Sequence, residues 1–93
     1  MTTESVLEEV LKERQRQINA LGWSPDHDDK INSDGQLAKA GAAYAMASCQ
    51  LAMQKDPWPW PDNWWKPEGG RRDLIRAAAL IVSEIERLDR KEK

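Results

Sequence analysis

The chain has 93 residues, enough for one domain with a modest hydrophobic core. Its net charge of −2, with 32% charged residues, excludes an overall field that would attract duplex nucleic acid or an acidic membrane. No apolar run is long enough to span a bilayer, and the charged amino-terminal run does not resemble a signal peptide. We therefore expect residues 1–93 to form a single cytoplasmic helical domain, completed by homo-oligomerisation because its core is small.

The first predicted helix covers residues 5–21, because Ser5 and Glu8 have the spacing of a capping box. At 100° per residue its apolar side chains share one face, namely Val6, Leu7, Val10, Leu11, Ile18 and Leu21. Arg14 lies near the centre of this face. Its guanidinium must either reach the rim along the apolar surface or bind a carboxylate or phosphate.

The segment 22–35 contains turn-forming residues at nearly every position and is predicted to be a loop. It includes His27, Asp28 and Asp29, which are residue types that bind metals or transfer protons. The alternative is an acidic loop whose aspartates cap helices and contact solvent. The pattern leaves both interpretations open.

The second predicted helix covers residues 34–55, with a capping box of Ser33 and Gln36. One face carries mostly small side chains, which are Leu37, Ala40, Gly41, Tyr44, Ala47, Ser48 and Leu51. Small side chains let a second backbone approach closely. This face therefore predicts tight helix packing, either within one chain or between copies.

A loop rich in tryptophan and proline is predicted for residues 56–70. Its four indoles can stack on a base, or they can fill the core of a chain that has no phenylalanine. Burying one indole contributes up to about 4–6 kcal/mol, which is large against a net stability of about 5–15 kcal/mol. We therefore expect at least two of the four indoles to belong to the core.

The third predicted helix covers residues 71–90 and carries an apolar seam at heptad spacing, formed by Leu74, Ala78, Ile81, Ile85 and Leu88. Two glycines and two arginines stand at its start. Free backbone N–H groups and the partial positive charge of a helix start favour an anion there. Arg71, Arg72 and Lys66 would hold a phosphate, unless carboxylates of the chain satisfy the arginines instead.

Acidic side chains follow one another along the first predicted helix. Glu9 and Glu13 share a face one turn apart, as helical metal-binding pairs do. Together with Asp28 and Asp29 they are the candidate ligands of Mg²⁺, and the other expectation is that the protein has no cofactor. The alternative is a solvated row of glutamates paired with Lys12 and Arg16.

Charge is distributed unevenly, since residues 1–34 carry a net charge of −4 and residues 71–93 a net charge of +2. Either ion pairs on helix surfaces or association between chains would bring these unlike segments together.

The order "ERQRQI…GW…HDD…WPWP…WWKP…RRDLI…EIERLDR", spanning residues 13–90, resembles a group of small proteins from phages and prophages. That group is distantly similar to MazG-like nucleotide pyrophosphohydrolases, whose four-helix core binds magnesium and a nucleoside triphosphate. The resemblance implies a phage-related origin, an α-helical fold and a nucleotide ligand. Hydrolysis is not implied, because Lys12 replaces the third acid of the EExxE metal motif.

The leading functional hypothesis is an accessory phage protein, in the host cytoplasm, that binds a nucleotide-like or phosphorylated small molecule without turnover and counteracts host defence. The candidate ligand-binding residues are Arg14, His27, Trp64, Trp65, Lys66, Arg71 and Arg72. A first alternative is a degenerate pyrophosphohydrolase that uses the acids named above with Mg²⁺. A second is an inhibitor or adaptor that grips a host protein through exposed tryptophans.

Overall fold

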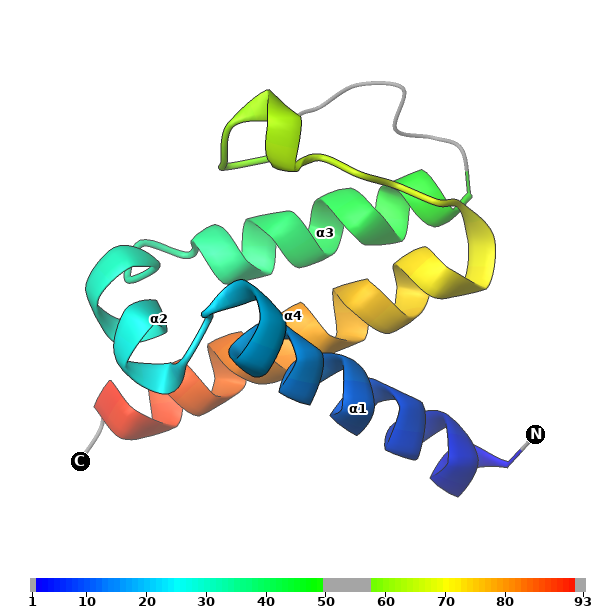
Figure 1. Ribbon diagram of the computed structural model, residues 1–93, viewed down its shortest axis with the longest axis horizontal. Helices are drawn as coiled ribbons and strands as arrows, with labels where there is room; N and C mark the ends of the chain where they lie inside the picture. The colour runs from blue at the N-terminus through cyan, green and yellow to red at the C-terminus, as the bar shows by residue number, and fades with distance from the viewer. Residues whose placement is uncertain (1, 50–57, 92–93) are drawn as a thin grey trace.

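A computed structural model describes residues 2–49 and 58–91. Four α-helices form in chain order, α1 (Thr3–Leu21), α2 (Pro25–Ile31), α3 (Gln36–Ser48) and α4 (Gly70–Lys91), with a short 3₁₀ turn at Asp62–Trp64. No strand occurs in either described range, so the predicted all-α class is confirmed. Helix α4 lies between α3 on one side and α1 on the other (Figure 1).

The start of α1 lies two residues before the predicted one. Thr2 is the N-cap, and its Oγ1 accepts a hydrogen bond of 3.1 Å from the Ser5 N–H. The Ser5 hydroxyl accepts one of 3.1 Å from the Thr2 N–H in return. Ser5 therefore completes a capping box that Thr2 begins, and the predicted pairing with Glu8 is wrong.

The buried face of α1 also differs from the predicted one. It consists of Val10, Glu13, Arg14 and Gln17, whereas Leu7 is 60% and Leu11 56% exposed. Ion pairs with α4 turn the polar side chains inward, and the leucines are left beside them on the surface.

Helix α2 replaces part of the predicted loop 22–35. The Ser24 Oγ accepts a hydrogen bond of 3.2 Å from the His27 N–H, and Pro25 occupies the first helical position. Proline is favoured there because its missing N–H would have no helical partner. Serine followed by proline was thus a helix start rather than a turn.

The predicted capping box of the second helix is not present. Helix α3 begins at Gln36, and its N-cap is Gly35, which has no side chain that could accept a capping hydrogen bond. The Gln36 amide oxygen instead accepts a hydrogen bond from the Asp34 N–H at 2.7 Å. Residues 50–55 of that predicted helix lie outside the described residues. Helix α4 matches its prediction within one residue at each end.

The main core lies between α3 and α4. It contains Leu37, Ala40, Tyr44, Ala77 and Leu80. A Cβ added to Gly41 would lie 3.2 Å from the carbonyl oxygen of Ala77, so the glycine lets the two helices approach closely. The small-residue face therefore packs within the chain, which is one of the two predicted outcomes.

Three of the four indoles of the tryptophan-rich loop pack against this core. These are Trp58, Trp60 and Trp65, and Trp23 joins them from the α1–α2 connection. The ring of Tyr44 lies 4.9 Å from that of Trp65, centroid to centroid. The expectation that at least two indoles of the loop contribute to the core is confirmed, while Trp64 remains 47% exposed.

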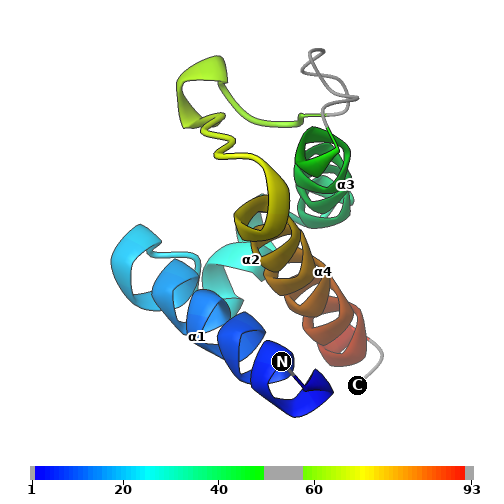
Figure 2. The same ribbon diagram turned by 90° about the vertical axis from the view of Figure 1, so that its right-hand side faces the viewer.

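A second, smaller apolar cluster joins α1 to α4 and consists of Val10, Ile75 and Ala79. The predicted apolar seam of α4 does not contribute its large side chains to either cluster, since Leu74, Ile81, Ile85 and Leu88 are 44–53% exposed. The predicted seam therefore lies largely on the surface of the single chain. Helices α3 and α1 pack on other sides of α4 (Figure 2).

No helix in the described ranges is both long enough and apolar enough to cross a membrane.

Candidate functional site

Arg14 is buried and fully engaged by the chain itself. Its Nη2 lies 3.3 Å from Asp28 Oδ2, its Nε donates to Glu86 at 3.2 Å, and its Nη1 donates to the carbonyl of Trp23 at 3.0 Å. Of the two predicted outcomes for this guanidinium, the specific anionic partner is the one found. Arg14 joins α1, α2 and α4.

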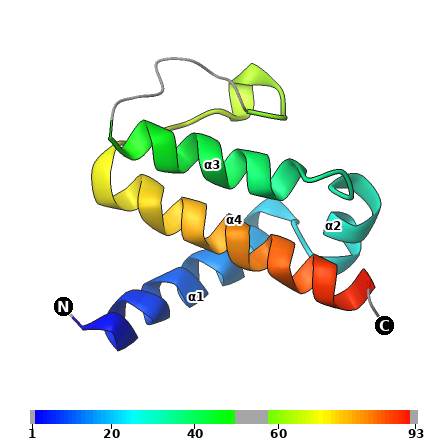
Figure 3. The same cartoon turned by 180° about the vertical axis from the view of Figure 1, so that it is seen from behind.

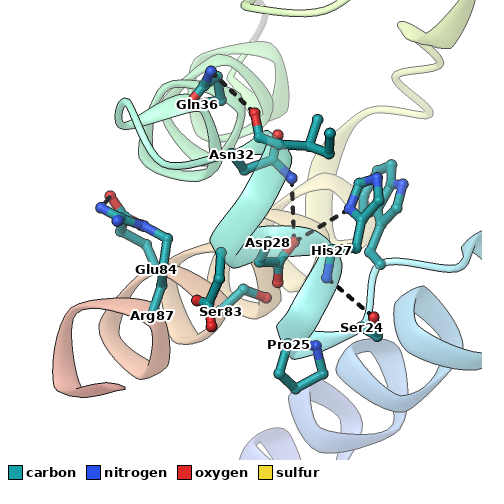
Figure 4. A network of polar contacts seen from close by, with 12 residues as sticks. Ser24, Pro25, His27, Asp28, Asn32, Gln36, Ser83, Glu84 and Arg87 are labelled. Carbon is teal, nitrogen blue, oxygen red and sulfur yellow. Dashed lines mark hydrogen bonds and ion pairs between the residues drawn. The ribbon is translucent and has the colours of Figure 1, made fainter. Parts of the chain in front are cut away.

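The carboxyl group of Asp28 is 0% exposed, and besides Arg14 it contacts His27 of α2 and Asn32, the C-cap of α2 (Figure 4). Burial raises the pKa of Asp28, although a hydrogen bond from Asn32 and the charge of Arg14 oppose that shift. Asn32 donates to Asp28 Oδ1 at 3.1 Å, and its own oxygen accepts from the indole N–H of Trp60 at 3.2 Å. A chain of polar contacts thus runs from α1 through α2 to the tryptophan segment.

The two arginines at the start of α4 also have partners on α1. Arg71 makes a two-pronged pair with Glu9, and Arg72 Nη2 lies 2.6 Å from Glu13 Oε1. The N–H groups of Glu68 and Gly69 donate to the carboxylate of Asp73 at 3.0 and 2.7 Å. The two arginines predicted to hold a phosphate are thus paired with carboxylates of the chain, whereas the Lys66 side chain is exposed.

The four predicted metal ligands are likewise paired with arginines. Asp29 binds Arg90 at 2.8 Å, and that pairing lowers the pKa of Asp29. The hydrogen bond from Arg71 lowers the pKa of Glu9 in the same way. Within the described residues no three histidine, cysteine, aspartate or glutamate side chains gather as a metal site would require.

Glu13 is a buried carboxylate that two arginines, Arg16 and Arg72, bind. Burial would raise its pKa, but hydrogen bonds from Arg16 and Arg72 outweigh burial and lower it below the usual 4.5. Arg16 holds the two oxygens at 2.9 and 2.8 Å. Glu13 is therefore ionised at neutral pH and anchors the wall of a cavity.

This cavity has a volume of about 520 Å³ and lies between α1, α4, Tyr44 of α3 and the segment around Trp64. Three aromatic rings line it, those of Trp23, Tyr44 and Trp64. Three cationic side chains also line it, those of Arg16, Lys66 and Arg76. Pockets of this size hold small organic ligands and cofactors.

Two buried polar atoms on residues that line the cavity lack a hydrogen-bond partner within the described part of the chain, Gln17 Oε1 and His27 Nδ1. Gln17 is only 2% exposed, and its Nε2 donates weakly to Glu13 at 3.5 Å. His27 Nδ1 lies 3.8 Å from Asp28 Oδ1, beyond hydrogen-bond distance. A buried polar atom without a partner costs about 1–3 kcal/mol, which a ligand could recover.

Of the residues predicted from sequence to bind a ligand, the structure places His27, Trp64 and Lys66 at this cavity. Trp65 packs on Tyr44 and Trp58 instead. Sequence reasoning missed Gln17 and Arg76 as site residues. Their signal was present but weak, because each lies one helical turn after a candidate, Glu13 and Arg72 respectively.

The cations of the cavity differ in how firmly they are held. Arg76 donates to Glu68 at 2.8 Å and to the backbone carbonyl of Lys66 at 2.9 Å, and its guanidinium lies 5.7 Å from the centre of the Tyr44 ring. Glu68 is exposed, so an incoming anion can replace it on Arg76. The Lys66 side chain is exposed at the rim.

No protein-family model, curated protein or solved structure matches the chain, so the chemistry of this cavity is the basis on which its function is inferred.

Proposed function

We propose that the protein binds an anionic small molecule with a flat aromatic ring, of the nucleotide class, in the cavity beside Glu13 and Trp64, and that it does not turn this ligand over. The observation that carries the proposal is the pair of unpartnered buried atoms, Gln17 Oε1 and His27 Nδ1, on residues of the cavity wall. Such atoms mark the place where a ligand donor or acceptor would be held.

The charge of the cavity favours an anion. Arg16, Lys66 and Arg76 contribute three positive charges and Glu13 one negative charge, so these four side chains sum to +2. A phosphate near Lys66 and Arg76 would replace the exposed Glu68 and gain charge-assisted hydrogen bonds.

The aromatic wall favours a flat ring. Trp64 is 47% exposed and lines the cavity, so its face is accessible to a base. Stacking of a base on an aromatic side chain contributes about 1–3 kcal/mol. The Gln17 oxygen can only accept hydrogen bonds, so it would select a ring that carries an N–H or amino group.

Binding without turnover agrees with the arrangement of the acids. Each of the four candidate Mg²⁺ ligands is paired with an arginine, and they do not gather in one place among the described residues. A protein of this kind would remove a nucleotide from solution, as expected of a phage accessory protein that counteracts host defence.

Isothermal titration with a panel of mono- and dinucleotides tests the proposal. We expect one of them to bind, and Trp64→Ala and Lys66→Gln each to weaken that binding about tenfold. Lys30→Gln, an exposed lysine on α2 outside the cavity, should bind as the wild type does. Absence of heat from every nucleotide, with a folded protein by circular dichroism, would refute the proposed ligand class.

The same ligand should be recovered intact. Incubation with Mg²⁺ and the bound nucleotide, followed by chromatography, should show neither pyrophosphate nor a shortened nucleotide. Product formation that is lost in Glu9→Ala would instead establish the pyrophosphohydrolase alternative.

A further inference from the structure

One side of helix α4 is not covered by another described helix (Figure 3). Leu74, Ile81, Ile85 and Leu88 are 44–53% exposed, and their spacings of seven, four and three residues place them on one face. Ile81 lies at the edge of this face beside Gly41 of α3, and Ala78, in the same row, is partly buried against the cluster that joins α1 to α4. Contiguous apolar surface of this kind marks an interaction site in a soluble protein.

This row, which we call the α4 stripe, faces away from the cavity. Of the two α4 residues that line the cavity, Arg76 lies about 160° and Leu80 about 120° around the helix from Leu74 at 100° per residue. A partner on the α4 stripe would therefore leave the cavity open.

The spacing of the side chains in the α4 stripe is nearly the same in both directions along the helix. Leu74 and Leu88 lie seven residues to either side of Ile81, and Ala78 and Ile85 lie three and four residues to either side. A two-fold axis produces interfaces in which one surface meets itself, so a row with this symmetry can pack against its own copy in the antiparallel direction.

We propose that a second copy of this chain covers the α4 stripe, with the two α4 helices antiparallel and related by a two-fold axis near Ile81. Leu74 of one copy then packs beside Leu88 of the other, and the two Ile81 side chains meet at the axis. Each copy buries its exposed row without a change in its own fold.

Charge selects the antiparallel direction over the parallel one. Arg71 and Asp89 are 18 residues apart, which is five full helical turns, so they lie along the same edge of the α4 stripe. When antiparallel helices are related by a two-fold axis, the same edge of the α4 stripe from both copies lies on the same side of the interface. Arg71 of one copy then lies near Asp89 of the other. Parallel pairing would instead align the two helix dipoles and would leave Arg71 far from Asp89 of the other copy.

Arg71 can pair with Glu9 of its own chain and with Asp89 of the second copy at the same time. Its side chain is 54% exposed while it pairs with Glu9, and a guanidinium has five N–H donors. Asp89 is exposed on the last turns of α4. The proposed contact thus adds an acceptor to Arg71 and does not require it to leave α1.

Sedimentation velocity over a dilution series tests whether a second copy covers this face. We expect a wild-type dimer and, for Ile85→Glu, a Kd raised by about 100-fold, because each interface would then hold two unpaired carboxylates. Ile31→Glu is the matched control, since Ile31 is 59% exposed but lies on α2, and it should remain dimeric. A monomeric wild type, or an Ile85→Glu variant that dimerises as the wild type does, would overturn the proposal.

Disulfide trapping in a Cys49→Ser background tests the direction of the helices. Ile81→Cys should cross-link under mild oxidation, and so should the double variant Leu74→Cys with Leu88→Cys. Leu74→Cys alone should not, because antiparallel pairing keeps its two copies far apart. Efficient cross-linking of Leu74→Cys alone would show parallel pairing and refute the antiparallel arrangement.

Discussion

The contact between α3 and α4 is built from small apolar side chains, whereas the contact of α1 and α2 with α4 depends largely on ion pairs. On the first side Gly41 and Ala77 bring the two backbones together, and Leu80 is 1% exposed. On the second side Arg14, Arg71 and Arg72 bind carboxylates far away in the sequence. The apolar side resists salt and acid, while the charged side responds to both.

The comparison also explains where the cavity lies. The cavity follows the polar side of α1, where Glu13 and Gln17 are buried among cations. Tyr44 and Leu80 of the contact between α3 and α4 also line the cavity, but among the described residues the buried polar atoms without a partner are on α1 and α2. The polar groups that could bind a ligand therefore lie beside the charged contact.

Removal of the buried guanidinium should give the largest loss of stability. Arg14→Ala leaves Asp28, which is 0% exposed, without its ionic partner, at a cost of about 3–5 kcal/mol at neutral pH. Because burial already raises the pKa of Asp28, the charge then left unpaired favours protonation further. The loss should therefore shrink as the pH falls, which urea titrations at several pH values would measure; an equal loss at every pH would contradict this account.

Neutralising Glu13 should weaken the charged contact by about 1.5–3 kcal/mol at pH 7, since hydrogen bonds to charged groups contribute that much. The pKa of Glu13 is lowered below 4.5 in the folded chain, so its contribution is present above pH 4.5 and is lost as the pH falls through the folded value. Thermal melts of the wild type and Glu13→Gln should thus converge in acid. Curves that stay parallel down to low pH would show that the charge of Glu13 contributes nothing.

The apolar contact should be sensitive to added volume. Gly41→Leu would press against Ile81 and the Ala77 carbonyl and should destabilise by about 1–3 kcal/mol. Ala42→Leu on the exposed side of α3 is the matched control and should cost little. The loss in Gly41→Leu should not depend on salt, and a strong salt dependence in urea titrations would argue against steric overpacking.

An exposed ion pair should give the smallest effect. Arg90→Gln breaks the pair with Asp29, whose side chains are 32% and 41% exposed, and should cost less than about 1 kcal/mol. Because salt screens such pairs, the difference from the wild type should fade at high ionic strength. Melting curves at low and high salt would measure it, and a loss as large as that of Arg14→Ala would be evidence against the distinction between buried and exposed pairs.

Periodicity and composition predicted the helical class, the extent of α4 and the contribution of the indoles to the core. They did not predict which face of α1 or α4 is buried, because that depends on partners far away in the sequence. Arg14 and Glu86 are 72 residues apart, and no local pattern shows that their contact turns α1 toward its polar side. For the same reason the cavity, which combines Gln17 with Trp64 and Arg76, could be anticipated only in part.

The central position of α4 also bears on how the chain is made. Both α1 and α3 pack on α4, yet α4 begins only at Gly70, after both of them in the sequence. During synthesis, therefore, neither earlier helix has its packing surface until α4 itself has been translated. Stable packing of α1 and α3 must wait for α4, and the small apolar face of α3 is uncovered in the meantime.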